Sequence, residues 1–103
     1  MLENQKTLKR EYTFEGKGLH TGLKVKMTVA PAPAGTGIRF VREDIGPDAV
    51  VEASAEYVTT TQRGTTLEKG EARISTIEHL LSAFSGMGVD NALVTLNAPE
   101  API

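Results

Sequence analysis

Alternation of apolar and polar residues predicts a chain built mainly of short β-strands. The clearest case is the segment 23–30, in which every second residue from Leu23 to Val29 is apolar and the residues between them are polar. Such alternation indicates an antiparallel strand with one buried and one solvated face. Similar patterns, supported by β-branched residues, predict further strands at 7–15, 38–42, 50–53, 57–61, 65–68, 71–74 and 91–96.

Glycine-rich turns connect several of these strands. Glycines at positions 16, 18 and 22 surround His20, so the strands 7–15 and 23–30 are expected to form a hairpin with His20 at its tip. Such a loop allows either a sharp turn or a close approach of the backbone to a ligand, and the sequence leaves both open. Lys69 and Gly70 predict a second, tighter hairpin between 65–68 and 71–74.

The segment 75–88 carries the strongest helix signal. Apolar residues at positions 77, 80, 81 and 84 recur at the spacing of one helical face. Ser75 and Glu78 fit a capping box, in which each side chain accepts a hydrogen bond from a backbone N–H at the helix start. Glycines at 86 and 88 offer a left-handed stop. The sequence therefore predicts a helix from about 76 to about 85.

Together these elements indicate the α+β class, with a mainly antiparallel sheet of short strands and one or two helices packed on one face. A second helix is allowed within 48–57, where alanines at 49, 53 and 55 tolerate it, although its apolar stripe is weak. The final residues, NAPEAPI, contain two prolines after the last strand. They resemble a linker or the exit from a domain.

Composition narrows the function classes. The chain has 103 residues, the size of one domain, and a net charge of −2 gives no footprint for nucleic acid or an anionic membrane. There is no apolar run of transmembrane length and no signal peptide, so a soluble cytoplasmic protein is the default expectation. Because the chain has no cysteine, any metal must be held by His, Asp or Glu.

The adjacent residues Glu78 and His79 are the main candidates for chemistry. At about 100° per residue, they fall roughly 110° and 150° from the centre of the apolar stripe, so neither belongs to the core face. The simpler interpretation is a capping glutamate beside a solvated histidine. The alternative is a metal ligand at His79 and a general base at Glu78. A catalytic zinc usually takes three protein ligands, so such a site needs His20 and a carboxylate, or ligands from another polypeptide.

Three segments together resemble one known family. They are FEGKGLHTG at 14–22, GTGIRF at 35–40, and RISTIEHLLSAFSGMGVDNALVTLNAPEAPI at 73–103. These segments are similar to the UDP-3-O-acyl-N-acetylglucosamine deacetylases, the zinc hydrolases that commit bacterial lipid A synthesis. The long last segment, with two upstream motifs at compatible spacing, makes the resemblance specific, and it spans nearly the whole chain. Only 42–67 is poorly constrained.

The resemblance implies a two-domain enzyme with its active site in the cleft between two similar α+β domains. This chain, 1–103, would be the N-terminal domain, truncated before the C-terminal domain. His79 would be one ligand of Zn²⁺, Glu78 would be the general base, and His20 would lie at the edge of the site and bind substrate. The remaining ligands, a histidine and an aspartate, would lie on the C-terminal domain. The loop 59–63 would lie where the family lines its substrate cleft, and a helix within 48–57 is favoured.

Two hypotheses follow. In the first, the partners of this chain are UDP-3-O-acyl-N-acetylglucosamine and the C-terminal domain of the same protein, and the isolated fragment is inactive because one histidine holds zinc weakly. In the second, the same fold is a non-catalytic binding or interaction module, in which Glu78 caps the helix and His79 lies on the surface. Zinc dependence distinguishes the two, because the module has no need of a metal.

Overall fold

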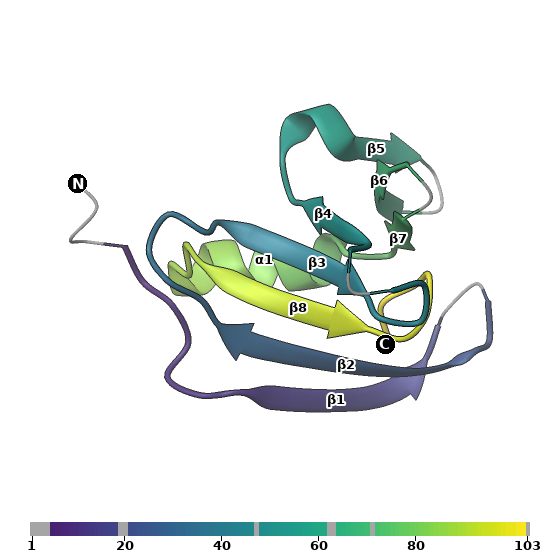
Figure 1. Ribbon diagram of the computed structural model, residues 1–103, viewed down its shortest axis with the longest axis horizontal. Coiled ribbons are helices and arrows are strands. Elements are labelled where there is room, and N and C mark those ends of the chain that lie inside the picture. Colours follow the sequence, from purple (N-terminus) through teal and green to yellow (C-terminus); the bar gives the residue numbers. More distant parts are fainter. Residues whose placement is uncertain (1–4, 19–20, 47, 62–63, 71, 103) are drawn as a thin grey trace.

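The computed structural model describes residues 5–18, 21–46, 48–61, 64–70 and 72–102. Their elements follow one another as strands, a single turn of 3-10 helix, one α-helix and a last strand (Figure 1). They are β1 (Tyr12–Lys17), β2 (Lys24–Pro31), β3 (Ile38–Arg42), β4 (Val50–Glu52), η2 (Ala55–Tyr57), β5 (Val58–Thr61), β6 (Gly64–Lys69), β7 (Ala72–Ser75), α1 (Glu78–Met87) and β8 (Ala92–Leu96). None of the helices in these ranges is long and apolar enough to cross a membrane.

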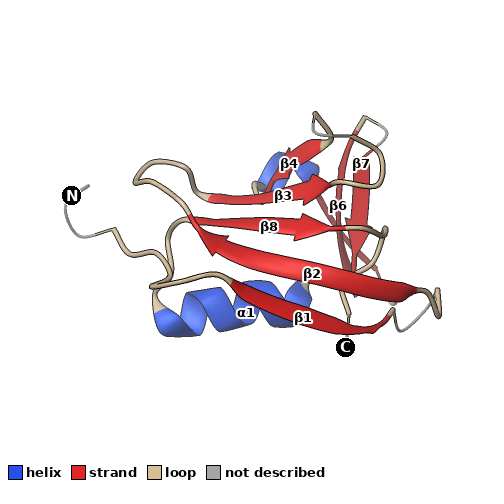
Figure 2. Cartoon of the chain, turned by 60° about the horizontal axis from the view of Figure 1, so that its bottom comes forward, coloured by secondary structure: helices blue, strands red, loops and turns tan. Residues whose placement is uncertain are grey.

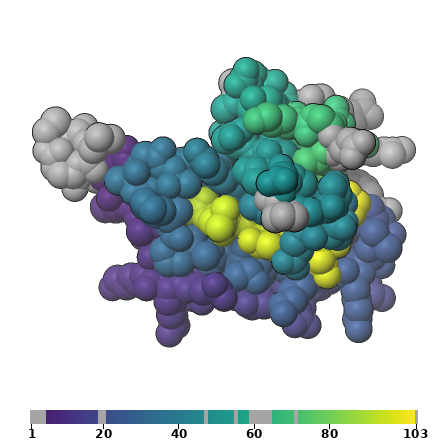
Figure 3. Space-filling view, viewed as in Figure 1, coloured from purple at the N-terminus to yellow at the C-terminus, as the bar shows by residue number. Residues whose placement is uncertain are grey.

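The strands form two sheets. The larger has the order β1-β2-β8-β3-β4 and the smaller the order β5-β6-β7. Neighbouring strands are antiparallel except for β3 and β8, which are parallel. The predicted α+β class with a mainly antiparallel sheet is confirmed. In the strand order of the larger sheet, the last strand, β8, is the central one. The space-filling view shows it only as a narrow yellow band between earlier segments (Figure 3).

One face of the larger sheet packs on α1 and forms the core (Figure 2). Val29, Val94 and Phe40 lie side by side across β2, β8 and β3 and are almost completely buried. Phe84 of α1 belongs to the same cluster. The lysines of β2 point to the opposite, solvated face. This confirms the one-sided burial that the alternation in 23–30 predicts.

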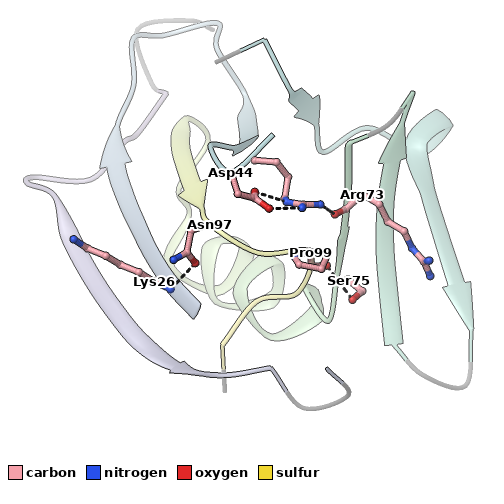
Figure 4. A network of polar contacts seen from close by, with 7 residues as sticks. Lys26, Asp44, Arg73, Ser75, Asn97 and Pro99 are labelled. Carbon is pink, nitrogen blue, oxygen red and sulfur yellow. Dashed lines mark hydrogen bonds and ion pairs between the residues drawn. The ribbon is translucent and has the colours of Figure 1, made fainter. Parts of the chain in front are cut away.

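The smaller sheet stands at one end of the larger one and is connected to it by a buried arginine. Arg42 at the end of β3 donates from Nη1 to the carbonyl oxygen of Arg73 in β7, at 2.8 Å. Its guanidinium also donates two hydrogen bonds to the carboxylate of Asp44, at 2.8 and 2.6 Å (Figure 4). Bidentate pairs of this kind fix geometry as well as adding energy. The arginine thus helps to hold β7 against the end of β3, and β7 leads directly into α1.

The second helix expected within 48–57 is wrong. Residues 50–52 form β4, which pairs with β3 and buries Val51 completely. Only the three residues of η2 are helical, as a single turn. Pairing with the preceding strand β3 therefore overrides the helix tolerance of the alanines.

The linker interpretation of the final residues is also wrong for 97–102. Asn97 Oδ1 accepts a hydrogen bond from the backbone N–H of Lys26, and the Pro99 carbonyl accepts one from the Ser75 hydroxyl (Figure 4). The same carbonyl also accepts from the backbone N–H of Ser75. The segment continues with isolated bridges from Glu100 to Ser75 and from Pro102 to Gly18. It is therefore folded against the rest of the chain.

Candidate active site at the start of the helix

Glu78 and His79 lie in the first turn of α1. His79 is exposed and Glu78 is half-buried, whereas the preceding Ile77 is completely buried. The prediction that neither Glu78 nor His79 lies on the core face is confirmed. Ile77 fixes the helix start to the core, and the two candidate residues project from that fixed point.

The predicted capping box is wrong. The N-cap residue is Ile77, and it makes no side-chain capping hydrogen bond. Ser75 belongs to β7, where its N–H donates to Pro99 and its carbonyl accepts from Ala101. The helix consequently begins at Glu78, two residues later than expected. Its other end is Met87, also two residues later than expected, and the predicted left-handed glycine stop is confirmed at Gly88, with φ 73°.

The backbone of Thr65 in β6, rather than the side chain of Ser75, makes the hydrogen bonds at the helix start. The N–H of Thr65 donates to Oε1 of Glu78, and the N–H of Ile77 donates to the carbonyl oxygen of Thr65, both at 3.3 Å. The β5–β6 hairpin is therefore held beside the first turn of α1. Residues 62 and 63 of the expected cleft loop 59–63 lie outside the described residues. The contacts at Thr65 nevertheless bring the end of that hairpin to Glu78.

Thr76 makes the turn from β7 into α1 in a strained conformation. Its φ is 60°, the only positive value at a non-glycine position among the described residues. This region costs an L-residue about 1–2 kcal/mol. Thr76 is also buried, and its hydroxyl donates a 2.8 Å hydrogen bond to Oε2 of Glu100. A hydrogen bond typically contributes about 0.5–1.5 kcal/mol, which is similar in size to the strain.

Glu100 is a buried carboxylate that sequence reasoning missed. Its side chain is completely buried, and both oxygens accept hydrogen bonds, Oε2 from Thr76 and Oε1 from the N–H of Thr21 at 2.9 Å. In the sequence, the only indication of this role is that Glu100 is a single acidic residue within an apolar, proline-containing segment. A buried carboxylate needs such partners because an uncompensated charge is strongly unfavourable in the interior.

Gly18 allows the first hairpin to approach this carboxylate. A Cβ at position 18 would lie 2.5 Å from the Thr21 hydroxyl oxygen and closer still to Oε1 of Glu100. Gly22, by contrast, has φ 69° and open space around it, so it serves the turn itself. The glycine-rich loop therefore contains a left-handed glycine at Gly22 and a close approach of the backbone at Gly18. The close approach at Gly18 is to a side chain of the same chain.

His20 lies outside the described residues. The predicted hairpin is confirmed, because Lys17 pairs with Lys24. Gly18 and Thr21, on either side of His20 in sequence, both lie against Glu100. Glu100 thus connects the loop that contains His20 to Thr76, three residues before His79.

The candidate metal ligand His79 lies on the surface beside Glu78. In the ranges that the structure describes, no three His, Cys, Asp or Glu residues are grouped closely enough to hold an ion. His79 supplies one exposed imidazole, and imidazole nitrogen is a common zinc ligand. Glu78 lies beside it, with Oε1 already hydrogen bonded to the backbone. This donor set fits one zinc ligand with a neighbouring carboxylate.

An apolar groove of about 370 Å³ runs along α1 on the side of β1. Tyr12 and Phe14 of the edge strand β1 face the helix side of the sheet but remain 38% and 48% exposed. Met87 at the end of α1 is 61% exposed and lines the same groove, as does Leu80. The groove therefore continues the core to the surface.

Comparison with known proteins identifies relatives over nearly the whole chain. Residues 5–103 match the family described as LpxC: UDP-3-O-acyl N-acetylglycosamine deacetylase. The UDP-3-O-acyl-N-acetylglucosamine deacetylases of Methylococcus capsulatus and Chromohalobacter salexigens are 52% and 50% identical over 99 residues, which cover 96% of this chain and 33% of each relative. The bifunctional enzyme LpxC/FabZ of Porphyromonas gingivalis is 46% identical over 99% of this chain and 22% of its own length. The chain thus spans a third or less of the length of these relatives.

Proposed function

Because the chain belongs to the UDP-3-O-acyl N-acetylglycosamine deacetylase family, we propose that it forms part of a zinc-dependent deacetylase. The substrate would be UDP-3-O-acyl-N-acetylglucosamine, from which the enzyme removes the N-acetyl group during bacterial lipid A synthesis. The observation that carries the proposal is the placement of Glu78 and His79. They project from a helix start that is fixed on three sides, by Ile77, Thr65 and Thr76.

The two residues would have different roles. His79 would hold the zinc ion through a ring nitrogen. A bound zinc lowers the pKa of water and polarises a carbonyl group, which are the two requirements of amide hydrolysis at neutral pH. Glu78 would accept the proton of the attacking water. Its Oε1 is fixed by the N–H of Thr65, so the orientation of the carboxylate is set before substrate binds.

The rest of the site would lie on a C-terminal domain of the same protein. One imidazole does not hold zinc tightly, and a catalytic zinc usually has three protein ligands. The length of the relatives leaves room for a second domain, and the apolar groove beside α1 offers a surface for it. On this proposal residues 1–103 form the N-terminal domain and are inactive alone. A cytoplasmic location, expected from the sequence, stays a prediction.

Zinc content and deacetylation of the full-length protein test the proposal. Wild-type protein should bind about one zinc per chain and hydrolyse the acetyl group, while His79→Ala loses both and Glu78→Gln keeps zinc but loses turnover. Ser82→Ala, an exposed change in the same helix, is the matched control and should behave as wild type. Zinc and turnover retained in His79→Ala would refute the assignment. If wild-type protein neither binds zinc nor hydrolyses the substrate, the alternative of a non-catalytic binding module with the same fold would be favoured.

A further inference from the structure

We propose that Glu100 is a positioning residue for the Glu78–His79 pair. Its buried carboxylate would hold the start of α1 and the loop of the first hairpin in one fixed arrangement. The inference rests on the proposed function for its catalytic consequence. Its structural part, the connection between Glu100, Thr76 and Thr21, rests on the contacts alone.

The first step is the contact between Glu100 and the junction of β7 with α1. Thr76 is the residue whose φ of 60° turns the strand into the helix, and its hydroxyl is bonded to Oε2. A backbone rotation at Thr76 changes the direction of every atom that follows. The Glu100 contact therefore selects the conformation that sets where α1 begins.

The second step leads from Thr76 to the candidate catalytic pair. Only Ile77 separates Thr76 from Glu78, and the N–H of Ile77 is itself bonded to Thr65. A release at Thr76 would therefore shift Glu78 and His79 relative to the β5–β6 hairpin. Misplacement of a reacting group by about 1 Å can lower a rate about 100-fold.

The third step is the contact of the same carboxylate with the first hairpin. Oε1 accepts from the N–H of Thr21, and Gly18 has no side chain where that oxygen lies. The hairpin loop and the helix start, more than fifty residues apart in the sequence, thus have one anchor. Loss of that anchor should therefore loosen both the hairpin loop and the helix start.

A pair of substitutions at Thr76 separates positioning from folding. Thr76→Val has nearly the same shape but cannot donate to Glu100, whereas Thr76→Ser keeps the hydroxyl. Amide hydrogen exchange in the 103-residue chain gives a readout that is independent of activity. With valine, exchange at Ile77 and Thr21 should become at least tenfold faster while exchange at Val94 in the central strand changes less than threefold. With serine, all three should stay near wild type.

The same pair should then be measured in the full-length enzyme. Thr76→Val should lower kcat roughly 10- to 100-fold at equal zinc content with little change in KM, and Thr76→Ser should remain within about threefold. Unchanged exchange at Ile77 and Thr21 in Thr76→Val would overturn the structural connection. Faster exchange with wild-type kcat would overturn the positioning role. An inactive wild-type enzyme would refute the proposed function instead, and the exchange result would still decide the connection.

Discussion

The hydroxyl of Thr76 and the carboxylate of Glu100, 24 residues apart in the chain, are joined by a buried 2.8 Å hydrogen bond. The bond spans the whole of α1 and β8 in sequence, yet its two partners lie at the same end of the helix. Residues 99–101 therefore contact Ser75 and Thr76, which lead into Glu78 and His79. Substitutions far from the helix in sequence should affect its first turn.

Gly18→Ala should destabilise the protein by about 1–3 kcal/mol, because its new methyl group would overlap the Glu100 carboxylate. Urea unfolding of the 103-residue chain measures this. Gly86→Ala is the matched control, since nothing lies within 4 Å of its added Cβ, and in a helix it should be neutral or stabilising by up to about 1 kcal/mol. Equal stability of Gly18→Ala and wild type would contradict the close contact.

Asp44→Asn should destabilise the fold by about 1–3 kcal/mol at neutral pH, because the buried guanidinium of Arg42 loses a charged partner. The hydrogen bonds from Arg42 hold the pKa of the Asp44 carboxyl below its ordinary value. A depressed pKa stabilises the folded state above the pKa of the unfolded state, about 3.9, and this contribution disappears as the pH falls through the folded value.

Urea unfolding across pH tests this sign. The difference in unfolding free energy between wild type and Asp44→Asn should be constant above about pH 5 and should shrink below about pH 4. A difference that grows on acidification would show that Asp44 is not stabilised in its charged form.

Glu78→Gln should change the stability of the chain by less than about 0.5 kcal/mol, because the amide oxygen can still accept the hydrogen bond from Thr65. Glu78→Ala removes the acceptor and should cost about 1 kcal/mol. Thermal unfolding of the two variants compares them directly. If Gln destabilises as much as Ala, the negative charge at the helix N-terminus matters more than the hydrogen bond.

Phe84→Ala should destabilise the protein by about 3–5 kcal/mol, since Phe84 is the buried residue of α1 and belongs to the core under the larger sheet. Met87→Ala, at the exposed end of the same helix, should cost less than about 1 kcal/mol. Denaturant unfolding followed by circular dichroism distinguishes the two. Similar losses would mean that the exposed Met87 contributes as much to stability as the buried Phe84.

Local patterns predicted most of the strands. The segment 38–42 matches β3 residue for residue, and 23–30 matches β2 within one residue at each end. Alternation identifies such strands because a half-buried sheet imposes a period of two on the side chains. The three motif segments likewise pointed to the family through their residues and spacing, and the match of residues 5–103 confirms that family.

Long-range contacts decided what local patterns could not. Ser75 and Glu78 had the right types and spacing for a capping box, but the backbone of Ser75 pairs with residues 99 and 101. The role of Glu100 depends on Thr21 and Thr76, both distant in sequence. The residues around position 100 show no periodic pattern that would indicate contact with either partner. Three roles stay predictions: His79 as a zinc ligand, Glu78 as a base and His20 in substrate binding.

The central position of β8 has a consequence for synthesis of the protein. β8 joins the β1–β2 pair to the β3–β4 pair, and it is made after both. At roughly 5–20 residues per second, roughly 3–10 s separate the synthesis of β3 from that of β8. During that interval, the strand edges of β2 and β3 that β8 will occupy have no partner in the larger sheet. A nascent chain stalled before residue 92 should therefore be a substrate for chaperones and a source of aggregates.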